Sequence, residues 1–290
     1  MSKILLKIDN LLEGTIIKRP SKYIKTPYVA DVIPITNNNS NTESVLAHSA
    51  ALGCCGLCDV GASVLMTFIE KKKKDDEKLH CEYRIYLSVL REKNKEIIIG
   101  IYPKLAEDLT EKALINNHLS ILKNIKRYRR ETVIYVEDKI DSRFDFSGID
   151  SNNIPFIMEV KNVPLANYED IDSKDRKKKC YDDRDVDSKI AYFPDGYRKT
   201  KNEPISPRAL KHIRELTLIK KMSKTRCIMC YVIQRDDAKM FQPSIIDPEY
   251  RNAVKTALES GVEIITMVVK WTRDGEAFFV TDCLPITSFE

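Results

Sequence analysis

The sequence predicts a mixed α/β (α+β) protein in which a small β domain, residues 1–102, precedes a mixed sheet flanked by helices, residues 103–290. Three observations support this prediction. The first hundred residues alternate short apolar segments with polar interruptions and contain few helical signals. Helical periodicity first appears at Pro103. Beyond that residue, apolar segments of strand length alternate with helical patterns, as in a sheet covered by helices.

Five segments of strand length in the first domain predict a small β-barrel or sandwich. They cover residues 15–17, 28–35, 63–69, 83–90 and 96–101. Residues 37–41 and 71–78, rich in Asn or in charge, are expected to be loops.

The composition is that of a globular intracellular protein. The chain has 290 residues, of which 43% are hydrophobic and 31% charged, enough for two domains with ordinary cores. It has no apolar run as long as a membrane span, and its first nine residues do not resemble a secretory signal. We therefore expect a cytoplasmic location, with the nucleus left open, no membrane partner, and reduced thiols for the eight cysteines. The net charge is only +5, so affinity for nucleic acid must come from local basic patches.

Two cysteine pairs have the spacing of metal ligands. Cys55 and Cys58 lie in the first domain, and Cys227 and Cys230 in the second. We do not expect structural zinc, because Cys227 and Cys230 lie in an apolar strand, where they would point to opposite faces.

A helix is predicted over residues 103–125, with leucines at helical spacing and Thr110 as a candidate start. Its end carries five basic residues around Tyr128, a composition suited to phosphate contacts and base stacking. A solvated helix end is an equally good interpretation. Nucleic-acid contacts are expected from Lys126, Arg127, Arg129 and Arg130, and outside this cluster from Arg143 and Arg208.

A β-hairpin is predicted over residues 142–161, with turn formers at 147–153 between two strand segments. Its second strand is an apolar run that carries Glu159 and Lys161 on one face. Glu and Lys are seldom buried without a partner, so this face needs compensating groups. The hairpin can bring Asp145 beside Glu159.

Two carboxylates at close range repel each other unless a cation lies between them. A hard cation with carboxylate, carbonyl and water ligands is most often Mg²⁺, with Mn²⁺ as a substitute. We therefore predict Asp145 and Glu159 as catalytic metal ligands and Lys161 as the catalytic group that holds or polarises the attacking water. The alternative is a salt-bridged strand end without a metal.

This order of residues, an Asp, a hairpin and then Glu-x-Lys on the next strand, resembles the PD-(D/E)xK nuclease core. The proline that usually precedes the Asp is Phe144 here. Nucleases of this class often draw a further acid from an upstream position, which makes Glu131 a candidate catalytic residue. Its alternative is a surface salt bridge.

Further segments occur in an order that is similar to the sugar fermentation stimulation protein A (SfsA) family. The resemblance covers residues 131–286 and implies an OB-like amino-terminal domain, a PD-(D/E)xK nuclease-like domain, DNA or RNA binding and nuclease activity. The Ala-, Gly- and Cys-rich stretch at 50–55 departs from the family pattern. The segments are EVKNVPL (159–165), YFPD (192–195), Arg208, KHIREL (211–216), GVEI (261–264) and LPI (284–286).

Residues 168–189 interleave acidic and basic residues and have no counterpart in shorter family members. Such a stretch cannot form a core. We expect an inserted surface loop that is mobile.

Two helices follow this insertion. Ser206 and Pro207 signal the first, which places Arg208, His212 and Glu215 within about 60° of one another, opposite its apolar face. This stripe matches the family and could flank a scissile phosphate, so His212 is a candidate catalytic residue. Asp247 signals the second helix, which Gly261 ends; a strand and an Asp274-Gly275 turn complete the sheet.

The leading hypothesis is a Mg²⁺-dependent nuclease that hydrolyses phosphodiester bonds in DNA or RNA. The alternative is a non-catalytic DNA- or RNA-binding regulatory protein. Binding alone does not require two carboxylates facing a phosphate, and the sequence contains no sugar-specific constellation. The choice between DNA and RNA, endo or exo cleavage, and the oligomeric state, with a dimer among the options, stay open.

Overall fold

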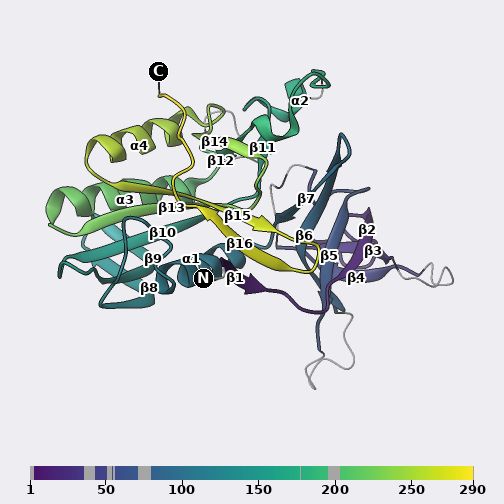
Figure 1. Ribbon diagram of the computed structural model, residues 1–290, viewed down its shortest axis with the longest axis horizontal. Helices are drawn as coiled ribbons and strands as arrows, with labels where there is room; N and C mark the ends of the chain where they lie inside the picture. The colour runs from purple at the N-terminus through teal and green to yellow at the C-terminus, as the bar shows by residue number, and fades with distance from the viewer. Residues whose placement is uncertain are drawn as a thin grey trace.

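The computed structural model describes residues 3–35, 43–50, 54, 56–70, 80–176, 178–194 and 203–289. These residues form a mixed α+β structure that is mostly sheet with few helices, as the sequence predicts (Figure 1). The Asn-rich and lysine-rich segments expected to be loops, residues 37–41 and 71–78, lie outside the described residues.

The first hundred residues contain β1 (Ile4–Lys7), β2 (Leu12–Lys18), β3 (Val29–Pro34), β4 (Val45–His48), β5 (Ser63–Phe68), β6 (Tyr83–Glu92) and β7 (Lys95–Gly100). The middle of the chain contains α1 (Lys104–Ile115), β8 (Arg127–Val136), β9 (Ile140–Ile149), β10 (Pro155–Val163), β11 (Ala166–Asn167), α2 (Ser173–Arg176), the 3₁₀ turn η1 (Val186–Ser188) and β12 (Lys189–Phe193). The last part contains α3 (Pro207–Met222), β13 (Arg226–Ile233), β14 (Ala238–Pro243), α4 (Pro248–Glu259), β15 (Glu263–Trp271) and β16 (Glu276–Thr281).

The strands β2 to β6 form an all-β unit around one core, to which Leu165, Val186 and Tyr192 from later in the chain also contribute. Their pairing runs β4-β3-β2-β5-β6, and β4 also pairs with β6 over two residues, so the ladder returns to its first strand. The core contains Ile16, Val32, Val64, Met66 and Ile85. All five predicted segments are strands, whereas the four-residue strands β1 and β4 were not anticipated.

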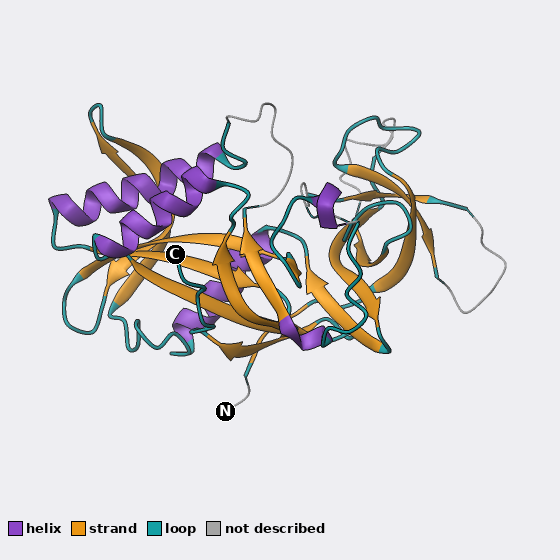
Figure 2. Cartoon of the chain, turned by 90° about the horizontal axis from the view of Figure 1, so that it is seen from above, coloured by secondary structure: helices purple, strands orange, loops and turns teal. Residues whose placement is uncertain are grey.

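The second half of the chain forms the other end of the same sheet. β10, β13 and β15 run parallel, flanked by the antiparallel strands β9 and β8. One face packs against α1 and the other against α3 and α4, which lie side by side (Figure 2). β1 joins this half, because it pairs with β16.

Helix α1 is shorter than predicted. It ends at Ile115, and Asn117 then adopts a left-handed conformation (φ +56°), which Asn tolerates better than most residues. The predicted helix over 103–125 is therefore wrong beyond residue 115, and the basic residues from Arg127 onwards lie on strand β8. Thr110 does not start the helix; it is buried inside it and its hydroxyl donates to the Ala106 carbonyl.

The other helix signals are mostly confirmed. Asp247 caps α4 by accepting a hydrogen bond from the Tyr250 N–H at 3.1 Å, and Gly261 follows the helix at φ +85°. Ser206 lies at the start of α3 but makes no side-chain cap hydrogen bond.

The insertion at 168–189, expected from its composition to be a surface loop, is anchored to the rest of the molecule on two sides. Asp170 is 4% exposed and accepts hydrogen bonds from Gln242 and Ser244. On the other side, Lys93 and Lys95 of the β6–β7 hairpin bind carbonyls of the insertion and Asp187. These anchors are residues distant in sequence, so composition alone could not reveal them.

Candidate functional site

The candidate site lies where β9 and β10 separate. Their pairing ends at Met158 opposite Phe146, and the next residues are Glu159 and Asp145. Phe144 and Phe146 are two positions apart on β9, yet they pack into the cores on opposite faces of the sheet. A regular strand would place both on one face, so the backbone is irregular at Asp145.

Asp145 is held against β10 as the predicted hairpin requires. Its Oδ2 accepts a hydrogen bond from the Val160 N–H at 2.7 Å. Burial and the negative charge of Glu159 raise the pKa of Asp145 to about 7. The carboxyl group therefore binds a proton more readily than an exposed aspartate does when no cation is bound.

Glu159 is the most enclosed group of the site, with 2% exposure. Its Oε1 contacts both Lys161 Nζ and His212 Nδ1. Burial alone would raise the pKa of Glu159, but Lys161 and His212 hold it below its usual range. Oε2 is buried and has no hydrogen-bond partner among the residues that the structure describes.

Lys161 and His212 enclose Glu159 from two elements. Lys161 lies two residues along β10 on the same face, and its Nζ is 3.3 Å from His212 Nδ1 on α3. The side chain of Lys161 is 11% exposed, so it is less enclosed than Glu159. The predicted alternation of β10 is confirmed, since Met158 and Val160 pack into the opposite core.

His212 and Glu215 of the polar stripe on α3 are buried against the sheet, whereas Arg208 at the start of the helix is exposed. Glu215 accepts a hydrogen bond from the Asp141 N–H at 3.1 Å, and its Oε2 is also buried without a partner in the described part of the chain. The sequence placed Glu215 on this stripe, but only the fold shows that it is buried near the start of β9.

Glu131 lies outside this enclosed group. It has φ +52° on β8 and forms an exposed ion pair with Arg143 at 3.5 Å. This is the surface salt bridge that the sequence left as the alternative.

The predicted basic cluster separates into two groups. Arg130 is held by Glu107, Asp108 and Glu111 of α1 at 2.9 to 3.1 Å, so its charge is already compensated. The other three are exposed: Lys126 contacts Asn153, whereas Arg127 and Arg129 line a groove of about 710 Å³ on β8, β9 and the start of β10. None of these three has a carboxylate partner among the described residues.

The two carboxylates, Asp145 and Glu159, suit a hard cation that is also bound by water better than a metal ion that is bound by protein side chains alone. No group of three or more His, Cys, Asp or Glu side chains is arranged to hold a metal within the described ranges. The two carboxylates and the unpartnered Glu159 oxygen leave the remaining positions to carbonyl groups or water, as hard cations accept. Cys227 and Cys230 pack into cores on opposite faces of β13 and cannot share an ion, and Cys55 lies outside the described residues.

A family model described as the sugar fermentation stimulation protein RE domain matches residues 104–275. The chain belongs to the sugar fermentation stimulation protein (SfsA) family. An SfsA homolog of Prochlorococcus marinus (strain MIT 9301) is 29% identical over 94% of this chain and 96% of its own length. An SfsA homolog of Jannaschia sp. (strain CCS1) is 26% identical over 95% of this chain and 94% of its own length.

A solved SfsA structure has the same fold. The structure of Pyrococcus furiosus SfsA in complex with Ca²⁺ matches with a TM-score of 0.67 at 19% identity, covering 98% of this chain and 99% of that one. The SfsA family match contains Asp145, Glu159, Lys161 and His212. In the described part of this SfsA protein, no helix is long and apolar enough to cross a membrane.

Proposed function

We propose that this protein is a nuclease that uses a divalent metal ion, Mg²⁺ or in its place Mn²⁺, to hydrolyse phosphodiester bonds in DNA or RNA. One observation supports this most strongly: Asp145 binds the Val160 N–H, next to Glu159, and the charge of Glu159 raises the pKa of Asp145. Lys161 contacts Glu159, whose other oxygen is buried without a partner among the described residues. The related P. furiosus protein is described in complex with Ca²⁺, another hard cation.

Each side chain has a role in this proposal. Asp145 and Glu159 hold the cation, which would lower the pKa of a bound water and offset charge on the phosphate. Lys161 orients the water and stabilises developing negative charge. His212 is a positioning residue, because it contacts Glu159 Oε1 and fixes the carboxylate.

A non-catalytic nucleic-acid-binding protein is the second candidate. It is favoured by the contacts of Glu159 Oε1, which Lys161 and His212 compensate without any metal, as in a structural ion pair. This alternative predicts affinity for nucleic acid without turnover.

The deciding experiment incubates labelled single- and double-stranded DNA and RNA with the protein in Mg²⁺, Mn²⁺ or EDTA. We expect cleavage with Mg²⁺ or Mn²⁺, none in EDTA, and a loss of at least about a hundredfold in Glu159→Gln. Glu249→Gln, an exposed carboxylate on α4, is the matched control and should cleave normally. Binding without cleavage under every condition would favour the non-catalytic protein.

The groove on β8 and β9 gives a prediction about duplex binding. Arg127→Gln/Arg129→Gln should weaken binding and lower the slope of log affinity against log salt by about 1.8, because about 0.9 is lost per phosphate contact. Arg130→Gln should leave the slope unchanged, since Arg130 is already paired with α1. Arg214→Gln, exposed and paired with Glu249, controls for net charge. An unchanged slope in the double variant would remove this groove from the binding surface.

A further inference from the structure

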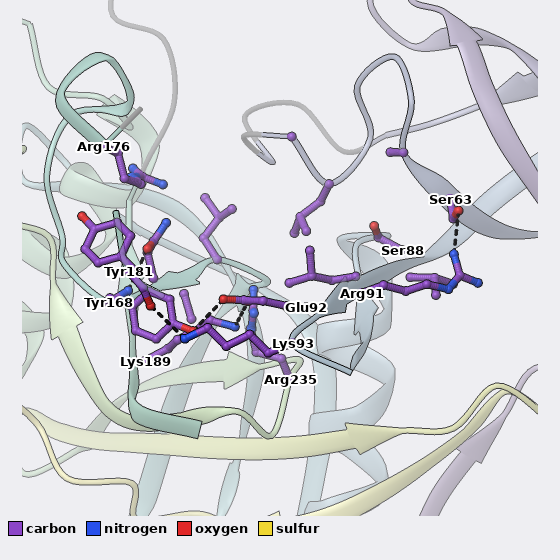
Figure 3. Close-up of a pocket in the computed structure, with 18 of the residues that line it drawn as sticks. Ser63, Ser88, Arg91, Glu92, Lys93, Tyr168, Arg176, Tyr181, Lys189 and Arg235 are labelled. Carbon is purple, nitrogen blue, oxygen red and sulfur yellow. Dashed lines mark hydrogen bonds and ion pairs between the residues drawn. The ribbon is translucent and has the colours of Figure 1, made fainter. Parts of the chain in front are cut away.

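A second concave site lies between the β2–β6 unit and the insertion. It is a pocket of about 1020 Å³, larger than the groove on β8. Figure 3 shows its two walls, with Ser63, Ser88 and Arg91 on one side and Arg176 and Tyr181 on the other. No residue of the candidate metal site lines it.

The pocket carries an excess of basic side chains. Glu92 and Asp182 are its acidic lining residues. The buried floor is compensated, because Lys189 binds Glu92 at 2.6 Å and Asp237 at 2.8 Å. The basic lining residues are Arg91, Lys93, Arg176, Lys179, Lys189 and Arg235.

Lys93 is the basic residue whose charge is not neutralised. It donates to the carbonyls of Tyr181 and Arg184, and no carboxylate of the described residues lies within ion-pair distance. The hydroxyl of Tyr181 is buried and lacks a hydrogen-bond partner in the same part of the chain. Among the described residues, Lys179 forms an ion pair with the partly exposed Glu169, which a phosphate can replace at little cost.

The pocket is connected to the candidate metal site through the backbone. β10 continues from Lys161 to its last residue, Val163, and Leu165, two residues later, lines the pocket. The four residue steps from Lys161 to Leu165 span at most about 13 Å, so one strand of nucleic acid could contact both the metal site and the pocket.

We propose that this pocket binds a single-stranded segment of nucleic acid. A lysine without a carboxylate partner among the described residues, a second lysine in an exposed ion pair, tyrosine rings and hydroxyl donors suit a phosphate backbone with unpaired bases. This proposal rests on the proposed function, because the pocket would hold the single strand that the metal site would cleave. The insertion at 168–189 forms one wall, so single-strand binding depends on this segment.

The test measures fluorescence anisotropy of a labelled single-stranded oligothymidylate in EDTA, where no metal-dependent cleavage occurs. Lys93→Gln/Lys179→Gln should weaken binding roughly tenfold or more near 0.1 M salt and lower the salt slope by about 1.4. Lys95→Gln is the matched control, because Lys95 lies on the same hairpin and binds Asp187 of the insertion but does not line the pocket. Its affinity should equal that of the wild type.

Three results would overturn the proposal: unchanged affinity in the double variant, equal weakening in Lys95→Gln, or an equal loss of affinity for a blunt duplex. The cleavage assay with Glu159→Gln separates this failure from failure of the proposed function. If the wild-type protein cleaves and the double variant keeps its single-strand affinity, only the proposal of a binding pocket is rejected. If the double variant loses affinity but the wild-type protein never cleaves, only the proposal of nuclease activity is rejected.

Discussion

Lys161→Met should lower the single-turnover cleavage rate by about a hundredfold or more, the scale expected when one electrostatic donor at a reacting centre is lost. Methionine keeps an apolar stem of similar length and removes the ammonium group. Metal affinity should persist, because Asp145 and Glu159 both remain. Lys211→Met, which removes an exposed lysine from the neighbouring helix α3, is the control and should retain activity.

The melting temperature of the same samples distinguishes catalysis from stability. Lys161 also compensates the buried Glu159, so its loss destabilises the metal-free protein. A role limited to this ion pair predicts that activity falls only in proportion to the folded fraction. A well-folded variant with unaltered cleavage would refute the catalytic role of Lys161.

The largest effect on stability is expected at Lys189. This side chain is 3% exposed and lies between Glu92 of β6 and the buried Asp237, while Arg235 also binds Asp237. Lys189→Met leaves buried negative charge without its lysine partner. We expect the free energy of unfolding to fall by about 3 to 5 kcal/mol, measured by urea denaturation.

Lys95→Met is the matched comparison for this prediction. Lys95 forms an exposed ion pair with Asp187, and its loss should cost less than about 1 kcal/mol. Similar losses in both variants would mean that the buried network contributes no more than a surface pair.

The sequence predicted those parts of the fold whose signals are local. The two-residue alternation of β10, the turn formers before it and the Asp-Pro start of α4 each determine structure within a few residues. The contact of Asp145 with the strand that carries Glu159 followed from the same hairpin, since Asp145 accepts a hydrogen bond from the Val160 N–H.

Other features depend on partners distant in the chain. The basic run at 126–130 is compatible with a helix end or a strand, and pairing with β9 decides it. The burial of His212 and Glu215 arises because α3 packs its polar stripe onto the sheet around Glu159 and Asp141. The anchoring of the insertion by Lys93 and Lys95 likewise could not be inferred from composition.

The pairing of β1 with β16 affects the order in which the strands of this protein can pair during its synthesis. Ile4 lies opposite Phe278, and the Ile8 N–H donates to the Gly275 carbonyl. The first strand, β1, therefore cannot pair until the last strand, β16, has been synthesised. At the usual pace of translation this wait is on the order of tens of seconds. The β2–β6 unit closes its ladder with residues before 93 and needs no such delay. On the ribosome, the strands of the amino-terminal unit are therefore able to pair first, while Leu165, Val186 and Tyr192 complete their core later and β1 stays unpaired until β16 has been made.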